Sequence, residues 1–204
     1  MKLFKMLIVG LSVLAILGTG LDLVGQEKSQ MSKEEQEMMK KWMDYSTPGP
    51  NHKYLESFVG EWDAVAKQWM KPGEPPITTE MPMKAKMLLG GRYLKYTVKG
   101  TMMDMPFEGM SITAFDNLEK KFISMWIDSM GTGIYMTEGT LDKTGKIRTE
   151  TGLWNDITTG GKSKVKMVYK TVDNDHILFE MYMSGGMYGD KEVKSMEITY
   201  TRKK

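Results

Sequence analysis

From residue 60 onward, apolar and polar residues alternate in short runs rich in Val, Ile, Thr, Tyr, Trp and Met. Turn signals separate these runs, such as GG at 90–91, DKTG at 142–145 and TTGG at 158–161. Alternation with a period of two is typical of half-buried strands, and closely spaced turns are typical of hairpins. No helical segment separates the runs, so a parallel sheet is not expected. The pattern therefore predicts an all-β fold, a single antiparallel up-and-down meander of about ten strands.

An open meander of this length would leave two unpaired edges, which closure into a barrel removes. The first run begins VGEWDA (59–64) and the last ends YTRKK (200–204), and these two segments are neighbours in a closed barrel. We expect Gly60 to allow a close bend and Trp62 to point inward. Arg202 would then lie over the indole ring as a cation–π partner. The alternative is an ordinary core tryptophan beside a solvated terminal arginine.

Two stretches before the barrel have the pattern of helices. In SQMSKEEQEMMKKWMDYS (29–46), Ser32 and Glu35 fit a capping box, and TPGP (47–50) ends the helix. NHKYLESF (51–58) fits a short helix directly before the first strand. An apolar stripe at helical spacing runs along the longer helix. We expect it to pack on the protein's own body, with a partner-binding face as the alternative; it comprises Met38, Met39, Trp42 and Tyr45.

The first 25 of the 204 residues have the features of a secretory signal peptide. MKLFK is positively charged, MLIVGLSVLAIL is an apolar stretch too short to span a bilayer comfortably, and GTGLDLVGQ supplies small residues. An uncleaved membrane anchor is the alternative. The chain has no cysteine, so an exported form would have no disulfides. We predict a signal peptide at 1–25, a helix and linker at 26–50 and the barrel at 51–204, in the periplasm or medium of a bacterium.

The charge balance argues against two classes of partner. The formal net charge is +2, and removal of residues 1–25, with two lysines and one aspartate, lowers it by one. Without a basic surplus we expect no nucleic-acid binding and no membrane association after signal cleavage. The oligomeric state is open.

Several blocks of the chain resemble one family. They are PGPNHKYLESFVGEWDA, LLGGRYLKYTVKGTMMDMPFEGM, FDNLEKKFISMWIDSMGTG and DNDHILFEMYM with MEITYTRKK. Together they are similar to the bacterial family called domain of unknown function 1579, over roughly residues 48–204. The resemblance implies a calycin-like barrel in the style of lipocalins and fatty-acid-binding proteins. It implies no activity and no site residues.

Several predicted strands carry polar and aromatic residues on one face, because residues two apart share a face of a strand. If these faces point inward, they form an apolar pocket with a few polar groups, which is the usual lining of a ligand site. If they point outward, the same residues are solvated. The candidate ligand-binding residues are Arg92, Tyr96, Trp126, Asp128, Glu138, Glu180 and Tyr182.

Catalytic and metal-binding motifs are absent from the sequence. Neither His52 nor His176 stands in a recognisable metal or haem motif, and no serine elbow or phosphate loop occurs. The 22 methionines could bind Cu(I), but they are spread over the chain, which favours their use as adaptable core filler. In TMMDMPFEGM (101–110) we expect a hairpin with its turn near Asp104–Pro106. We predict no metal, no cofactor and no catalytic residue.

Three functions fit these observations. The first is an exported barrel that binds a small apolar or amphipathic ligand. The second is an enzyme that uses paired barrel carboxylates, such as Glu138 and Glu180, on a bound molecule. The third is a structural or partner-binding envelope protein that holds no ligand.

Overall fold

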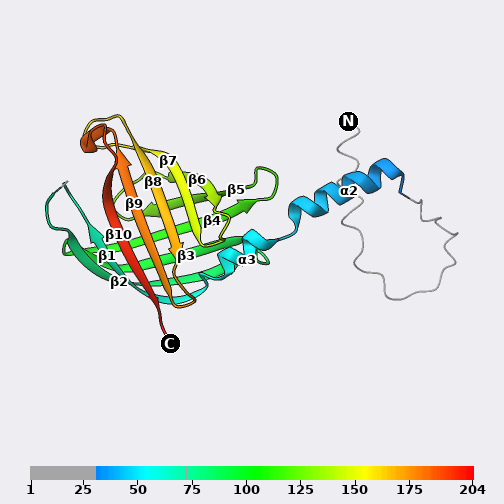
Figure 1. The fold of residues 1–204 in the computed structure, drawn as a ribbon, viewed down its shortest axis with the longest axis horizontal. Helices are drawn as coiled ribbons and strands as arrows, with labels where there is room; N and C mark the ends of the chain where they lie inside the picture. The colour runs from blue at the N-terminus through cyan, green and yellow to red at the C-terminus, as the bar shows by residue number, and fades with distance from the viewer. Residues whose placement is uncertain (1–30, 72) are drawn as a thin grey trace, which may run out of the picture. The chain divides into compact units, whose positions relative to one another are not determined.

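The computed structural model describes residues 31–71 and 73–204. Residues 39–204 form one compact unit, and the described residues 31–38 lie outside it. The larger unit is a closed antiparallel barrel in which each strand pairs with the next and β10 pairs with β1 (Figure 1). The predicted ten-strand meander barrel is thus confirmed; the expected signal peptide (1–25) lies outside the described residues. The strands are β1 (Gly60–Gln68), β2 (Ile77–Leu88), β3 (Tyr93–Met102), β4 (Met105–Asp116), β5 (Lys121–Asp128), β6 (Tyr135–Leu141), β7 (Ile147–Asn155), β8 (Lys162–Thr171), β9 (His176–Ser184) and β10 (Val193–Arg202).

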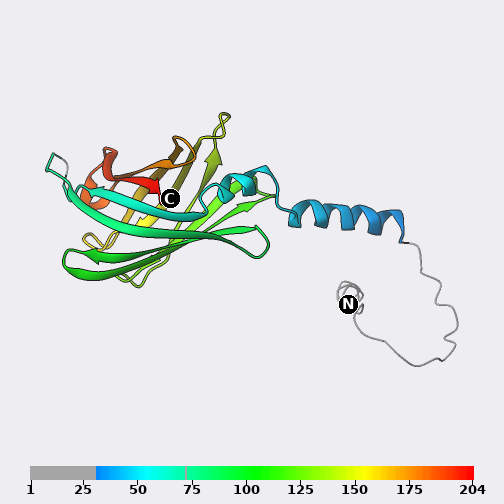
Figure 2. The same ribbon diagram turned by 90° about the horizontal axis from the view of Figure 1, so that it is seen from below.

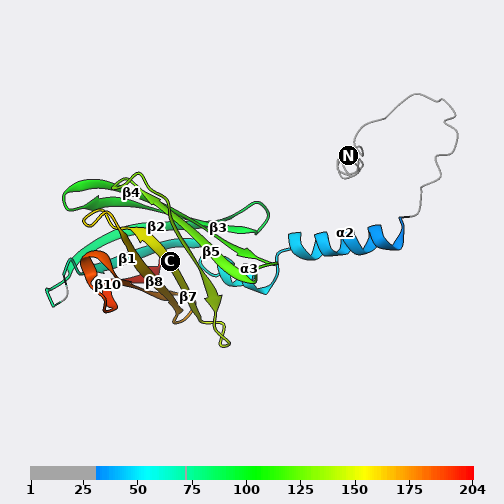
Figure 3. The same cartoon turned by 90° about the horizontal axis from the view of Figure 1, so that it is seen from above.

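Each strand alternates between the barrel interior and the outer surface. On β1, Trp62 and Ala64 are buried in the interior, whereas Glu61 and Asp63 are exposed between them. The same alternation continues around the wall, where β3 and β4 lie opposite β8 (Figure 3). Burial of one face of every strand provides the main stabilisation of the barrel.

One end of the barrel, which we call the base, is covered by α3 (Pro50–Glu56). Proline at its first turn suits a helix start, because the ring fixes φ and the missing N–H has no helical partner there. The helix buries Tyr54 and Leu55 and packs against β2, β3 and β4 (Figure 2). The opposite end carries the hairpin connections β1–β2, β3–β4, β5–β6, β7–β8 and β9–β10, the last with a 3₁₀ turn, η1 (Gly186–Tyr188). We call it the far end.

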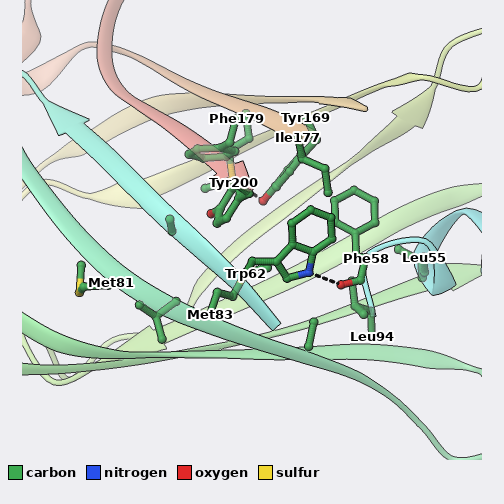
Figure 4. Close-up of a cluster of buried hydrophobic side chains, with 14 of the residues drawn as sticks. Leu55, Phe58, Trp62, Met81, Met83, Leu94, Tyr169, Ile177, Phe179 and Tyr200 are labelled. Carbon is green, nitrogen blue, oxygen red and sulfur yellow. Dashed lines mark hydrogen bonds between the residues drawn. The ribbon is translucent and has the colours of Figure 1, made fainter. Parts of the chain in front are cut away.

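The core above the base is rich in aromatic side chains. Trp62 from β1 points toward Phe58 and donates a hydrogen bond from Nε1 to the Phe58 carbonyl oxygen at 2.9 Å (Figure 4). Tyr169 and Tyr200, from β8 and β10, approach from the other side of the same interior (Figure 4). Side chains from the first and last strands therefore share one core, which ties the two ends of the meander together.

The longer helix, α2 (Lys33–Ser46), begins with the expected capping box. The Ser32 backbone N–H donates to Glu35 Oε2 at 2.8 Å, and the Glu35 N–H donates to Ser32 Oγ at 3.2 Å. Its last turn is held by Asn117, whose side-chain amide donates to the Tyr45 carbonyl oxygen at 2.9 Å. Within the described residues, no helix has the length and apolar character needed to cross a bilayer.

The apolar stripe of α2 is not covered by the barrel. Met39, Trp42 and Tyr45 are exposed, Trp42 to 65%. The expectation that these side chains pack on the protein's own body is therefore wrong. The helix is stabilised locally at both ends by its cap and by Asn117, so it does not need burial of that stripe to form.

The methionine-rich hairpin turns earlier than expected. The two-residue turn is Met103–Asp104, both with positive φ (49° and 60°), and Pro106 already belongs to β4. Two successive positive φ values are typical of the tight turn that best matches strand twist. Met102 packs against the core, whereas Met103 and Met105 are exposed. These methionines do not gather on one side of the wall.

Candidate functional site

The two ends of the barrel wall meet at Trp62 and Arg202, which are opposite each other in the β1–β10 register. The Arg202 guanidinium carbon lies 4.0 Å from the centre of the Trp62 indole ring. Gly60 has a φ of 134°, and a Cβ there would approach Arg202 Nη1 to 2.7 Å. Arg202 also donates to the carbonyl oxygens of Val59 (2.6 Å) and Ser57 (2.8 Å). This arrangement closes the base and stabilises the barrel.

A pocket of about 360 Å³ lies beside this closing pair at the base. Buried Trp62 and Ile177 form its apolar part, and Asp173 and Arg202 its charged part. A second pocket, of about 470 Å³, includes the outward-facing side chains of Glu138, Lys164 and Tyr182. Neither pocket is lined by the buried ion pair described next.

A charged pair lies inside the barrel. Arg148 and Glu150 are two residues apart on β7, so both side chains point to the same face, and their exposed fractions are 1% and 0%. Arg148 Nε lies 3.2 Å from Glu150 Oε1. Burial lowers the pKa of Arg148, but the Glu150 carboxylate and neighbouring tyrosines outweigh it, so the pKa of Arg148 stays above its ordinary value. Arg148 is therefore a buried cation.

Aromatic rings surround the guanidinium of Arg148. Its central carbon lies 4.1 Å from the centre of the Tyr169 ring, 5.4 Å from Phe122, 5.6 Å from Phe58 and 5.9 Å from Tyr54. Such contacts stabilise a cation through the negative face of each ring. Two of these rings precede β1, so the base helix segment and the barrel wall jointly hold Arg148.

Glu150 is held by hydroxyl groups from β6 and β5, the next two strands of the wall. Ser124 Oγ donates to Oε1 at 3.0 Å and Thr137 Oγ1 donates to Oε2 at 2.6 Å. Thr113 Oγ1 lies 2.9 Å from Ser124 Oγ and extends the chain of hydroxyls. Glu150 therefore accepts hydrogen bonds at both oxygens while it faces the guanidinium of Arg148. The interior thus contains one compensated pair of charges.

Arg148 is not fully hydrogen-bonded. Its Nε is within ion-pair distance of Glu150, but the N–H is not aligned for a hydrogen bond, and Nη1 also has no partner among residues 31–71 and 73–204. A buried donor without a partner costs about 1–3 kcal/mol. Native proteins rarely leave such groups unpaired.

Buried and partly buried tyrosines lie near the pair. Burial raises the pKa of Tyr96, against the opposing effect of the neighbouring Ser111 and Tyr169 hydroxyls. Burial likewise raises the pKa of Tyr169 and of Tyr200 well above the usual range. All three phenols are therefore neutral, and Tyr96 and Tyr169 add donor groups near Arg148 without adding charge.

Three of the seven sequence-predicted ligand residues share the inward faces. Tyr96 lies near the Arg148–Glu150 pair on β3, and Trp126 and Asp128 lie farther toward the far end on β5. Trp126 Nε1 donates to Asp128 Oδ2 at 2.6 Å. The indole ring lies across Gly109, where a Cβ would approach it to 2.3 Å. A ligand-binding role for these three residues stays a prediction.

The other four do not line the interior, so the inward orientation considered for them does not hold. Arg92 is in the exposed β2–β3 turn and donates to the Leu89 carbonyl oxygen at 3.0 Å. Glu138 lies on the outer face and pairs with Lys121 at 3.0 Å. Tyr182 lies under the ammonium group of Lys166 (4.5 Å), also on the outer face. The strand alternation was correct, but the inward face is the opposite one.

The expected inward orientation of Glu180 is also corrected, because its side chain is buried yet points outward. Its carboxylate lies between Lys170 (2.6 Å) and Lys194 (3.1 Å) on the outer surface of β8–β10. The Lys170 contact and, less strongly, the Lys194 contact lower the pKa of Glu180. Since Glu138 and Glu180 both face away from the interior, an enzyme that uses these two carboxylates on a molecule inside the barrel is excluded.

Sequence reasoning missed Arg148 and Glu150. On the run IRTETGLWN, the face with Arg148, Glu150, Gly152 and Trp154 reads as more polar than the face with Ile147 and Leu153. The usual rule would turn the charged face outward. The spacing of Arg, Glu and Trp on one face was the available signal, since Trp154 is inward and packs against the core.

The histidines are not arranged as metal ligands. His52 is buried at the base, where its Nδ1 accepts from the Gly49 N–H at 3.0 Å, and burial followed by the nearby Arg92 charge lowers its pKa. His176 is exposed and its Nδ1 lies 2.9 Å from Asp173. In the described parts of the chain, no three His, Asp or Glu side chains gather into a metal-binding group.

A comparison with protein-family models assigns this chain to a family. The model of the family described as "Protein of unknown function (DUF1579)" matches residues 47–202. The chain belongs to the DUF1579 family. The resemblance seen in the sequence is therefore confirmed. A comparison with functionally curated proteins gave no match.

Solved structures similar to this DUF1579 barrel show how widely the fold occurs. Rv2717c from M. tuberculosis is 13% identical, with a TM-score of 0.53, over 78% of this chain and 100% of that chain. The S-type phycobiliprotein lyase CPES from Guillardia theta is 9% identical, with a TM-score of 0.55, over 80% of this chain and 97% of that chain. At these identities the likeness shows the fold alone.

Proposed function

We propose that this DUF1579 protein binds a small amphipathic molecule inside the barrel, with its polar group at Arg148. The observation that carries the proposal is the pair of unpartnered nitrogen atoms, Nε and Nη1, on an arginine that is 1% exposed. A bound acceptor would satisfy these donors and so remove their desolvation cost.

The lining toward the far end suits the apolar part of such a molecule. Whereas the side chains at the base are buried, several inward-facing side chains nearer the far end are only half-buried, which indicates incomplete filling of the interior there. Most are apolar or aromatic, and methionine adapts well to ligands of irregular shape. They are Ala66, Trp126, Trp154, Met181, Met196 and Ile198.

A polar group stands near each end of this lining. At the deep end are Arg148 and the neutral Tyr96 phenol. Toward the far end, Trp154 Nε1 is buried without a partner among the described residues, and Asp128 accepts from Trp126. Apolar walls with a few well-placed polar groups are the usual composition of small-molecule sites.

Native mass spectrometry of protein purified from its own source tests the proposal, because a retained molecule would appear as an added mass. A matched pair of variants tests whether the retained molecule lies inside the barrel. Ala66→Phe adds a ring on the inward face of β1, whereas Val65→Phe adds the same ring on the outward face. Loss of the added mass in Ala66→Phe alone is expected. No added mass in the wild type, with no binding of apolar fluorescent probes, would contradict the proposal.

We also propose that the protein is exported to the periplasm or the medium, on the strength of the charged and apolar pattern of residues 1–25. N-terminal sequencing of the protein isolated from a fractionated culture tests this, since export with cleavage would yield a chain that starts near residue 21 or 26. An intact N-terminus in the cytoplasmic fraction would contradict it.

A partner-binding function is the second candidate, which we propose because Met39, Trp42 and Tyr45 form an exposed apolar stripe on α2. If the stripe binds another protein, Trp42→Ala should abolish co-purification of that partner while the melting temperature stays unchanged. Equal recovery of the partner with the variant would exclude the stripe as its site.

A further inference from the structure

We infer that the group bound at Arg148 is an uncharged hydrogen-bond acceptor, such as the carbonyl of an ester, ketone or amide, and not a carboxylate or phosphate. This inference rests on the proposed function and names the chemical class of its ligand. It follows from the charge that already accompanies Arg148, together with the donors that remain unused.

The charge of Arg148 is already compensated. Glu150 lies 3.2 Å away and is 0% exposed, so the two side chains form a buried ion pair without net charge. In the described residues Arg148 is the only buried lysine or arginine, and no second buried cation can balance a further anion. A ligand carboxylate would therefore leave one uncompensated negative charge in a low-dielectric interior, which is strongly unfavourable.

Glu150 cannot easily be displaced to make room for a ligand anion. Both of its oxygens accept hydrogen bonds, from Thr137 on the neighbouring strand β6 and from Ser124 on β5, one strand farther along the wall. A ligand carboxylate in its place would have to move a carboxylate fixed by the wall itself. The ligand thus adds to the pair and does not replace one member of it.

The free N–H groups of Arg148 need a hydrogen-bond acceptor, but this acceptor does not need to be charged. Rings of Tyr169, Phe122 and Phe58 lie around the guanidinium, so their contribution to stabilising the cation does not depend on a ligand. Among residues 31–71 and 73–204, Nε and Nη1 have no hydrogen-bond partner. A carbonyl oxygen supplies lone pairs to such donors and adds no net charge.

Two probes of the same chain length decide the question: dodecanoic acid and methyl dodecanoate, titrated into the full-length mature protein at neutral pH. The wild type should bind the ester at least about tenfold more tightly than the ionised acid. Tighter binding of the acid would overturn the inference while leaving the proposed function intact. Failure of both probes, together with no retained mass in the native protein, would instead overturn the proposed function, and the inference with it.

The variant Glu150→Gln provides a more specific test of the inference than the wild type alone. It removes the negative charge, keeps the size of the side chain and leaves Arg148 as an uncompensated cation, so the preference should shift toward the acid by about tenfold or more. The matched control is Glu138→Gln, an outer-face carboxylate, which should leave the ester-to-acid ratio unchanged. An unchanged ratio in folded Glu150→Gln would contradict the inference. If that variant does not fold, the wild-type ratio alone decides.

Discussion

Arg148 and Glu150 point into the barrel from one strand, with Nε and Oε1 3.2 Å apart and neither side chain more than 1% exposed. The pair is held by the rings of Tyr54 and Phe58 before β1 and by hydroxyls from β5 and β6. Because buried charges cost free energy that pairing only partly returns, such a pair is better explained by a site than by a need for stability.

Removal of one member of this pair should be far more damaging than removal of both. Arg148→Met leaves Glu150 buried without its counter-charge and should lower the free energy of unfolding by about 3–5 kcal/mol. The double variant Arg148→Met/Glu150→Met removes both charges and should recover most of that loss. Urea unfolding of the wild type, both single variants and the double variant measures the difference. Additive losses in the double variant would show that the two side chains do not act as a pair.

Trp62 closes the base, and its loss should weaken the whole barrel. The ring is fully buried, stacks under Arg202 and donates to the Phe58 carbonyl oxygen. We expect Trp62→Ala to lower the free energy of unfolding by about 3–5 kcal/mol. Trp42→Ala, at an exposed position on α2, serves as the control and should change it by less than about 0.5 kcal/mol. A loss below about 1 kcal/mol for Trp62→Ala would argue against its closing role.

Gly109 provides the space over which Trp126 lies. A Cβ at this position would lie 2.3 Å from the indole ring, so Gly109→Ala must displace the ring. We expect a loss of about 1–3 kcal/mol in unfolding free energy and a change in tryptophan fluorescence. Gly133→Ala is the control, since nothing lies within 4 Å of a Cβ there. Unchanged fluorescence in Gly109→Ala would indicate that the ring is free to move.

Asp156 joins two loops at the far end, and it should make stability depend on acid pH. It accepts from the Thr158 hydroxyl at 2.6 Å and from the Met187 N–H at 2.8 Å. These hydrogen bonds hold the pKa of Asp156 well below its usual range. An unfolded aspartate has a pKa of about 3.9, so this stabilisation is fully present above about pH 5 and is lost as the pH falls toward the lower folded pKa.

The difference in melting temperature between the wild type and Asp156→Asn measures this contribution of the Asp156 charge. The variant should melt at a lower temperature than the wild type at pH 7. The difference between the two melting temperatures should decrease progressively below about pH 4. Thermal melts between pH 3 and pH 7 measure it. A gap that is constant over this range would show that the Asp156 charge does not contribute.

Much of the barrel was predictable from local pattern. The alternation in β1, the turn residues between strands and the Gly60, Trp62 and Arg202 segments are short-range features, so they predicted a closed meander without knowledge of the packing. The Ser32–Glu35 cap was predictable for the same reason, because it spans three residues of one helix turn.

Which residues share a face of a strand follows from the sequence alone, but which face points into the barrel depends on the folded protein. On β6 and β9, Glu138, Glu180 and Tyr182 share faces with apolar residues, and so does the Arg148–Glu150 face of β7. A period of two is the same for either orientation. The choice follows from contacts far apart in the chain: Phe58 and Tyr54 from the base meet Arg148 from β7, and Ser124 and Thr137 meet Glu150. These long-range contacts hold a charged face inside, which no local pattern could indicate.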